Sequence, residues 1–144
     1  MKFLIFTWLV LAICELQATE SVSVTSPDGK IQISFSGFTE SFSTENQDSL
    51  WYNIIYQNKI IIHNSPVSLR FRNAQDFGHN LSVVRQTVKE ISEKTELLYG
   101  KSRYLDDRGR ELRIYLKENQ SPYRNCTLIA RAYDDGVAFR LNFT

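Results

Sequence analysis

The sequence has few cysteines and almost no net charge. Only Cys14 and Cys126 occur among its 144 residues, and Cys14 lies within an N-terminal apolar run. The rest of the chain therefore has no pair of cysteines for an intramolecular disulfide. A formal net charge of +1 gives no electrostatic reason to expect nucleic acid or an anionic membrane surface as a partner. The 42% of hydrophobic residues is typical of a globular chain, and the length predicts one domain.

The sequence also lacks the motifs of common catalytic and metal sites. It contains no nucleophile elbow, phosphate-binding loop, paired CxxC or zinc-binding helix motif. His63 and His79 stand apart from any second ligand at metal spacing, so surface or turn positions are expected for both. Cys126 is expected to be a small buried hydrophobe rather than a nucleophile. We therefore nominate no catalytic, cofactor-binding or metal-binding residue.

The N-terminus has the pattern of a secretory signal peptide. Lys2 supplies a positive charge, and the apolar run 3–13 (FLIFTWLVLAI) is shorter than the roughly 20 residues of a transmembrane helix. Ala18 is the small residue before the predicted cleavage site. We expect residues 1–18 to be removed and residues 19–144 to form the mature domain.

Cys14 offers a second interpretation of the N-terminus. Its sequence LAIC resembles a bacterial lipoprotein attachment site, although Ile13 is bulkier than the residue usual there. Export to the periplasm or to the outer membrane is expected in either case, with no transmembrane segment after cleavage. Lipidation at Cys14 is left open.

Short alternating segments bounded by turn residues predict an all-β antiparallel sandwich. Asp134 and Asp135 precede Gly136, which is expected at positive φ in a turn with a bulge. Breaks or loops are expected at 64–66 and 72–80. The predicted hairpins pair 21–25 with 31–35, 51–56 with 60–63 through a tight turn at 57–59, and 127–133 with 137–143. Further strands are predicted at 67–71 and 111–116.

The segment 81–98 has two interpretations. Val84, Val88 and Ile91 fit one stripe of a helix, and this periodicity slightly favours a helix. The same valines and isoleucine also suit short strands. The residues alone leave the choice open.

Adjacent carboxylates occur at Asp106–Asp107 and at Asp134–Asp135. They would be metal ligands or an acid/base pair only if both faced one ligand, but neighbours along a strand point to opposite faces. Aspartate is also a common turn residue beside glycine. The turn interpretation is favoured for both pairs.

Aromatic residues and N-x-[ST] motifs complete the candidates. Flat aromatic rings with polar edges can stack on sugars, but core and sheet packing is the favoured interpretation. The N-x-[ST] motifs begin at Asn80, Asn125 and Asn142 and matter only in a eukaryotic secretory pathway. The aromatic residues considered are Trp51, Tyr52, Tyr56, Tyr99, Tyr104, Tyr115, Tyr123 and Tyr133.

The end of the sequence suggests a missing neighbour. The chain stops at Thr144, directly after an apolar predicted strand. Exposed apolar edge strands promote aggregation and are usually covered. We therefore expect the domain to be incomplete at its C-terminus, with further strands to follow.

Several segments, in order, resemble the N-terminal domain of glycoside hydrolase family 97, which includes α-glucosidases and α-galactosidases of Bacteroidota. VTSPDGKIQISF (24–35) resembles the opening hairpin of that family. WYNIIYQNKIII and SPVSLRF follow, and then YGKSRYLDDRGRELRIYL (99–116). ARAYDDGVAFRLNF (130–143) is the most specific match. The sequence departs from the family pattern at Asp107, Arg108 and Arg110, which suggests a divergent member.

The resemblance implies an N-terminal β-super-sandwich followed by a (β/α)₈ catalytic barrel and a C-terminal β-domain. The catalytic carboxylates would come mainly from the barrel, and a calcium ion would sit in the active site of the full-length enzyme. The family's calcium-binding glutamate in the N-terminal domain would fall after Thr144. The resemblance also favours strands for 81–98.

These expectations define two functional hypotheses. The first is a non-catalytic N-terminal sandwich of a secreted enzyme acting on α-linked glucosides or galactosides. It would pack on the barrel of the same polypeptide, help to wall the pocket for an oligosaccharide, and be inactive alone. The second is a stand-alone exported β-sandwich module that binds carbohydrate or protein.

Overall fold

The computed structural model describes residues 21–39, 49–96 and 104–143. The predicted signal peptide lies outside these residues. The described residues form strands and connecting turns, and no helix among them is long and apolar enough to cross a membrane. The strands are β1 (Val22–Thr25), β2 (Ile31–Ser36), β3 (Trp51–Tyr56), β4 (Lys59–Pro66), β5 (Leu69–Phe71), β6 (Ala74–Phe77), β7 (Leu81–Glu96), β8 (Tyr104–Glu118), β9 (Asn125–Tyr133) and β10 (Val137–Phe143).

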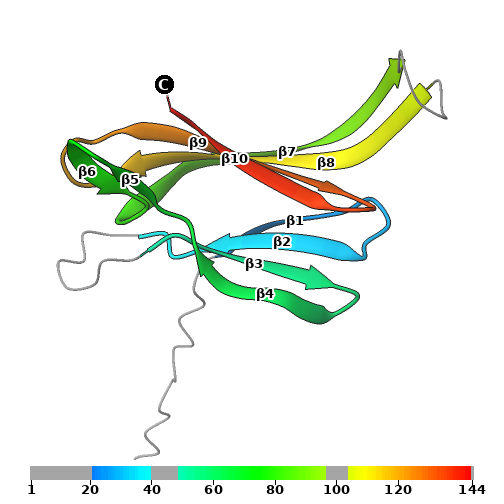
Figure 1. Ribbon diagram of the computed structural model, residues 1–144, viewed down its shortest axis with the longest axis horizontal. Helices are drawn as coiled ribbons and strands as arrows, with labels where there is room; N and C mark the ends of the chain where they lie inside the picture. Colours follow the sequence, from blue (N-terminus) through cyan, green and yellow to red (C-terminus); the bar gives the residue numbers. More distant parts are fainter. Residues whose placement is uncertain (1–20, 40–48, 97–103, 144) are drawn as a thin grey trace, which may run out of the picture.

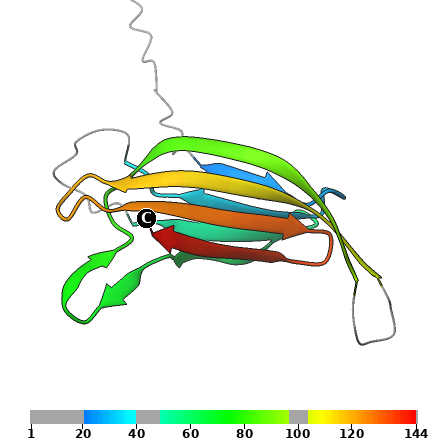
Figure 2. The same cartoon turned by 90° about the horizontal axis from the view of Figure 1, so that it is seen from above.

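Two antiparallel four-stranded sheets lie face to face (Figure 1). The first sheet has the order β1-β2-β3-β4 and the second the order β10-β9-β8-β7. Seen from above, the second sheet covers the first, and the small β5–β6 sheet lies at one end (Figure 2). The predicted antiparallel β-sandwich is therefore confirmed.

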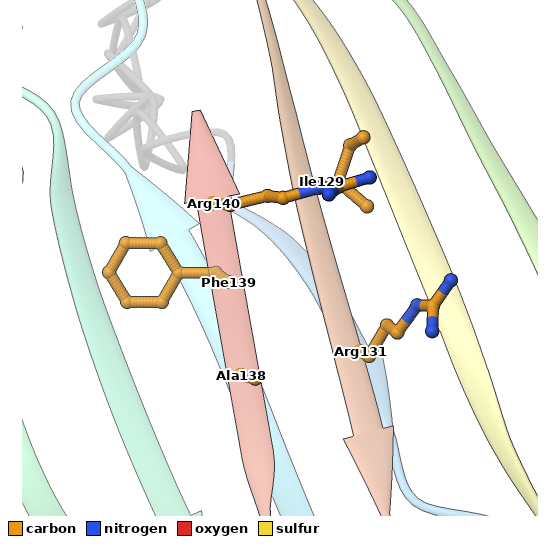
Figure 3. A pocket seen from close by; sticks show the side chains of 5 residues that line it. All are labelled: Ile129, Arg131, Ala138, Phe139 and Arg140. Atoms are coloured by element: carbon orange, nitrogen blue, oxygen red, sulfur yellow. The ribbon is translucent and has the colours of Figure 1, made fainter. Parts of the chain in front are cut away.

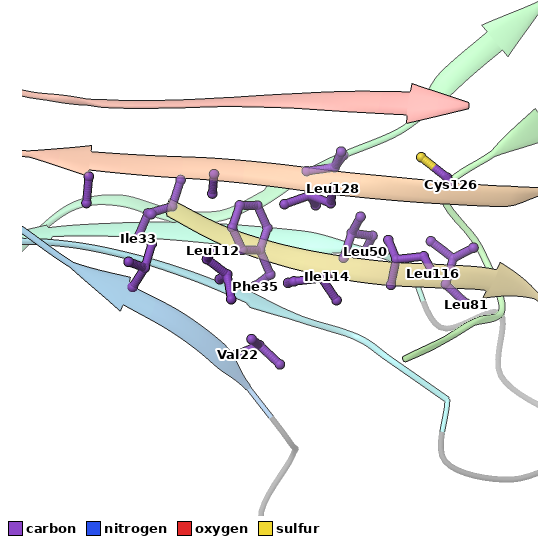
Figure 4. Packing of buried hydrophobic residues seen from close by; sticks show 14 of the residues in the cluster. Val22, Ile33, Phe35, Leu50, Leu81, Leu112, Ile114, Leu116, Cys126 and Leu128 are labelled. Atoms are coloured by element: carbon purple, nitrogen blue, oxygen red, sulfur yellow. The ribbon is translucent and has the colours of Figure 1, made fainter. Parts of the chain in front are cut away.

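The core lies between the two sheets because alternate side chains of each strand point inward. In β2 these side chains are Ile31, Ile33 and Phe35, which are all buried. The facing positions of β8 and β9 are also buried, as Figure 4 shows for the labelled members of the cluster. The inward residues of these two strands are Leu112, Ile114, Leu116, Cys126, Leu128, Ala130 and Ala132.

The segment with two interpretations forms one long strand as far as the structure describes it. β7 pairs with β8 from Leu81 to Glu96, so the helix favoured by periodicity is wrong and the strand implied by the resemblance is confirmed. The helical stripe fails because Val88 and Ile91 lie on opposite faces of the strand. Val88 is 57% exposed, whereas Ile91 is 6% exposed. Pairing with β8 overrides the weak local preference.

Two other boundaries differ from the prediction. The expected break at 64–66 belongs to β4, because register shifts in the β3–β4 pairing absorb the irregular residues. Asn64 has a positive φ of 43°, and its N–H donates to Asn53 Oδ1 at 2.7 Å. Pro66 is tolerated because β4 is an edge strand. The expected loop 72–80 contains β6, and the strand expected at 67–71 begins only at Leu69.

Hairpin turns show one confirmed and one wrong prediction. Gln57 and Asn58 form the tight β3–β4 turn with φ values of 47° and 62°, as a type I′ turn requires. Gly136 does not take the expected positive φ. The β9–β10 register also continues without a shift up to Val137. The N–H of Tyr133 donates to the carbonyl of Gly136 at 2.8 Å, so the two aspartates alone make the turn.

Gly29 and Gly136 provide a matched test of whether a turn requires a positive φ at its glycine. We expect Gly29→Ala to destabilise the fold by about 1 kcal/mol, because Gly29 has a φ of +76° that L-residues disfavour. Gly136→Ala should change stability by less than about 1 kcal/mol, in either direction, because its Cβ would meet no atom within 4 Å. Urea unfolding of both variants measures this. Equal losses would contradict the assignment of the two turns.

Candidate functional site

The outer face of the second sheet carries the charged side chains. The inward alternation of Leu112, Ile114 and Leu116 forces Glu111, Arg113 and the neighbouring odd-numbered residues of β8 to point outward. Pairing with β7 and β9 then sets charged residues of three strands beside one another. The cations of this face are Arg85, Lys89, Arg113, Lys117, Arg131 and Arg140.

Glu111 is the buried centre of this charged face. Its side chain is 1% exposed. Arg113 Nε donates to its Oε1 and Arg131 Nε to its Oε2, both at 2.7 Å, and Lys89 Nζ lies 3.3 Å from Oε1. Burial alone would raise the pKa of Glu111, but hydrogen bonds from the three cations outweigh it and lower the pKa to about 2. The carboxylate is therefore ionised at neutral pH.

The cations outnumber the carboxylates on this face. In the described region where all four strands of the sheet lie side by side, Glu111 is the only carboxylate on the outer face. Arg85 stacks on the ring of Tyr115, with 4.1 Å from its Cζ to the ring centroid. Such a contact holds a guanidinium in place without neutralising it. A chain of net charge +1 thus presents one strongly positive face.

A shallow hollow opens at the edge of this face, beside β10. Its volume is about 210 Å³, and it is lined by Ile129, Arg131, Ala138, Phe139 and Arg140. Figure 3 shows the Arg131 and Arg140 side chains extending on the same side of β9 and β10 as Ile129, whereas the Phe139 ring points away from them. Two guanidinium groups therefore flank a floor that is apolar.

A second, more polar pocket lies near the small β5–β6 sheet. It has a volume of about 300 Å³. Glu118 forms part of its wall. Glu118 Oε1 accepts a hydrogen bond from Arg124 Nη2 at 2.7 Å, and Oε2 accepts one from Arg124 Nε at 2.8 Å. Burial raises the pKa of Glu118, but the Arg124 hydrogen bonds outweigh it and keep the pKa below its usual range. The lining residues are Gln75, Asp76, His79, Asn80, Glu118, Gln120 and Ser121.

Aromatic contacts fix the small sheet to the sandwich. The Phe77 ring meets the Phe143 ring edge-on, with 4.8 Å between centroids. Arg124 lies over the rings of Phe71 and Phe77, at 5.1 and 5.6 Å from their centroids, and its Nη2 donates to the carbonyl of Asp76 at 3.1 Å. One arginine thus joins the polar pocket to the β5–β6 sheet.

The flank beside β10 is apolar and only partly covered. β10 is an edge strand of its sheet and β4 an edge strand of the other. Phe139 contacts Phe35 and Tyr52, with ring centroids 5.6 and 5.0 Å apart, yet it is 36% exposed. On β4, Ile60 and Ile61 are 60% and 61% exposed. Within the described part of the chain, these two edge strands each pair with one neighbouring strand and carry exposed apolar side chains.

The candidate carboxylates and histidines form no common site among the described residues. Asp134 is exposed, and its Oδ1 accepts from the backbone N–H of Asp28 at 2.8 Å. It thereby joins two turns, which supports the turn interpretation. His79 Nδ1 lies 3.0 Å from Ser49 Oγ, and His63 is exposed. No group of three or more His, Cys, Asp or Glu side chains in the described part could hold a metal ion. The side chains of Asp106 and Asp107 lie outside the described residues.

Cys126 is buried, as predicted. It is 2% exposed and belongs to the core cluster. Burial raises the pKa of its thiol to about 11. The thiolate needed for nucleophilic chemistry is therefore scarce at neutral pH, and the interpretation as a small hydrophobe is confirmed.

The aromatic residues divide between packing and exposure. Tyr52 packs against the core cluster, Tyr115 lies under Arg85, and the hydroxyl of Tyr133 accepts from Arg131 Nη1 at 3.3 Å. These positions support the packing interpretation. Tyr123 is 59% exposed and has a φ of +60°, which is unusual for a bulky residue. Tyr99 and the side chain of Tyr104 lie outside the described residues.

Sequence reasoning missed Glu111, Arg131 and Arg140. A signal was present, because charged residues occupy the positions of ELRIYL and of the last hairpin that alternate with apolar ones. Such residues are normally taken as solvated. Their meeting on one face depends on the pairing register of β7 to β10.

The fold and these features define an antiparallel β-sandwich domain with a charged sheet face and an uncovered flank. The family model described as Glycosyl-hydrolase 97 N-terminal matches residues 24–144. The chain belongs to this family, and the resemblance noted in its sequence is confirmed.

Its relatives are much longer proteins. The chain is 26% identical over 141 residues to a retaining alpha-galactosidase of Bacteroides thetaiotaomicron. This alignment covers 97% of this chain and 19% of the relative. A glycoside hydrolase family 97 enzyme from Pseudoalteromonas sp. strain K8, in complex with panose, superposes with a TM-score of 0.73. It is 23% identical over 85% of this chain and 17% of that chain. A beta-arabinopyranosidase superposes with a TM-score of 0.66, at 26% identity over 83% of this chain and 18% of that chain. The chain thus spans less than a fifth of the length of each relative.

Proposed function

We propose that this chain is the non-catalytic N-terminal β-sandwich portion of a secreted glycosidase, and that it packs on a (β/α)₈ catalytic domain of the same polypeptide. The match to an N-terminal family model and the short span of the longer relatives support this proposal. In this arrangement the sandwich positions the catalytic domain and helps to wall its substrate pocket, and it performs no bond cleavage itself.

The uncovered flank is the observation that carries the proposal. Phe139 on the edge strand β10, and Ile60 and Ile61 on the edge strand β4 of the other sheet, leave a third or more of their surface in water. Burying apolar surface is favourable by roughly 25 cal/mol per Å². Covering this flank with another part of the polypeptide would stabilise both parts and remove an edge that otherwise promotes aggregation.

We propose α-linked glucosides or galactosides as substrates of the whole enzyme. The names of the alpha-galactosidase and of the panose complex support this class. The beta-arabinopyranosidase shows that relatives of this fold also carry a differently named activity. For the calcium ion expected in the whole enzyme, the described residues of this chain provide no suitable group of ligands.

The proposal predicts a domain without activity that associates through its flank. The chain should show no hydrolysis of p-nitrophenyl α-glucoside or α-galactoside above background when calcium is present. Light scattering should show self-association that rises with concentration. Ile61→Lys should reduce it, because a charge at this edge disfavours apolar contact and strand pairing.

Val84→Lys is the matched control for this experiment. Val84 is 67% exposed and lies on β7, at the opposite edge of the second sheet from β10, so its replacement should leave association unchanged. Turnover by the chain would overturn the non-catalytic assignment. A strict monomer at high concentration, or equal effects of the two lysines, would overturn the role of the flank.

One observation favours the second candidate function, a stand-alone exported carbohydrate-binding module. The pocket of about 300 Å³ is lined by amide, carboxylate and hydroxyl groups, which suit the hydroxyls of a sugar. The gene distinguishes the two candidates. An open reading frame that continues after Thr144 into barrel-coding sequence supports the first, and a stop followed by an unrelated gene supports the second.

A further inference from the structure

The hollow beside β10 combines positive charge with an apolar floor. Arg113 of β8, Ile129 of β9 and Arg140 of β10 lie in one cross-strand row. Arg131 lies in the next row, opposite Ala138. Ile129 is 6% exposed, so it forms a floor between the two arginines of the hollow (Figure 3). The strand register thus places both guanidinium groups at one small cavity.

Arg131 is held in place by other groups of the sheet. Its Nε donates to Glu111 Oε2 at 2.7 Å and its Nη1 to the Tyr133 hydroxyl at 3.3 Å. These contacts fix the plane of the guanidinium and leave N–H groups on Nη2 without a bond to either partner. A fixed donor loses little conformational entropy when a ligand binds.

Arg140 is the cation of this hollow that has no partner among the described residues. Its side chain is exposed and makes no hydrogen bond or ion pair with the part of the chain that the structure describes. The nearest carboxylate of the face, Glu111, already has three cations. The hollow therefore has an excess of positive charge that one anionic group would neutralise.

We propose that this hollow binds the carboxylate of a uronic acid sugar. A planar guanidinium fork matches a carboxylate in a bidentate arrangement, and Glu111 shows how two arginines of the same face bind one. The apolar floor suits the less polar face of a sugar ring. A volume of about 210 Å³ is below the roughly 300–1,000 Å³ of sites for larger ligands, so the hollow takes one ring.

The sugar part of this assignment rests on the proposed function, whereas the carboxylate part rests on the two arginines alone. Binding requires neither hydrolysis nor a catalytic domain. A failure of the binding experiment is therefore distinct from a failure of the activity and association experiments described above.

The test is a titration of the ¹⁵N-labelled chain with sodium glucuronate, sodium acetate and glucose at constant ionic strength. Glucuronate should shift the side-chain Nε signals of Arg131 and Arg140. It should bind about tenfold more tightly than acetate or glucose, because only glucuronate offers both the charge and the ring. The affinity should fall as salt is added, since the site is exposed.

Arg140→Gln should weaken glucuronate binding about tenfold, and Arg140→Lys should weaken it less because the charge is kept. Arg85→Gln is the control. It removes the same charge from the same face, and it should change the affinity by less than about twofold. An affinity for glucuronate no higher than that for acetate or glucose would overturn the proposal. So would equal effects of Arg140→Gln and Arg85→Gln.

Discussion

Glu111→Gln is expected to lower the free energy of unfolding by about 3 kcal/mol at pH 7. The carboxylate is 1% exposed and bound by Arg113, Arg131 and Lys89. Removing one member of a buried ion cluster typically costs about 3–5 kcal/mol. The lower end applies because the three cations, which are 35–57% exposed, would regain water.

The same variant predicts a specific dependence on pH. The folded pKa of Glu111 is about 2, against an ordinary value of 4.5. A lowered folded pKa means that the carboxylate stabilises the fold fully above pH 4.5, and that this contribution is lost as the pH falls towards 2. The stability difference between the wild type and Glu111→Gln should therefore shrink over that range. Urea unfolding at a series of pH values measures it.

Glu90→Gln is the matched control for the charge. Glu90 is 85% exposed, and its contact with Arg110 measures 3.9 Å. Exposed pairs contribute at most about 1 kcal/mol, so this variant should change stability little at any pH. A Glu111→Gln variant as stable as Glu90→Gln would show that the cluster does not stabilise the sandwich.

Phe77→Ala is expected to destabilise the fold by about 3–5 kcal/mol, because it leaves a cavity in a closely packed region. Phe77 is fully buried and contacts the ring of Phe143 and the guanidinium of Arg124. Its loss would also loosen the β5–β6 sheet and the wall of the polar pocket. Thermal and urea unfolding would measure the effect, and Phe77→Leu should cost less.

Phe71→Ala tests whether the stability lost in Phe77→Ala comes from burial of the ring or from its aromatic contacts. Phe71 contacts the same two partners but is 40% exposed. Its replacement should cost no more than about 1.5 kcal/mol, since less apolar surface leaves water on folding. Similar losses at both positions would contradict the view that burial of Phe77 anchors the small sheet.

Local pattern was enough to predict most of the architecture. The alternation of Ile31, Ile33 and Phe35 and the turn at Gln57–Asn58 were sufficient to identify hairpins, because both depend on neighbours in sequence. The segment 81–98 was ambiguous because its strand character depends on pairing with β8. Gly136 was misassigned because aspartates before a glycine suit more than one turn geometry.

The candidate sites were harder to predict because they depend on register. Lys89, Glu111 and Arg131 are far apart in sequence and meet only when three strands align. Net charge conceals such an arrangement, since a near-neutral total can hide a strongly positive face. The polar pocket likewise depends on tertiary structure that brings residues 75–80 beside residues 118–121.

The long β7–β8 hairpin runs past the sandwich (Figure 1), and only its inner half has a neighbour in β9. A one-residue shift in the pairing register of β8 would expose Leu112 and Ile114 to water and place Glu111 in the hydrophobic core. Packing of the inner half therefore sets the β7–β8 register of the outer half as well, because the outer half has no β9 neighbour to set it. Substitutions in the outer halves of β7 and β8 should therefore be tolerated, provided that they leave the alignment of the inner halves unchanged.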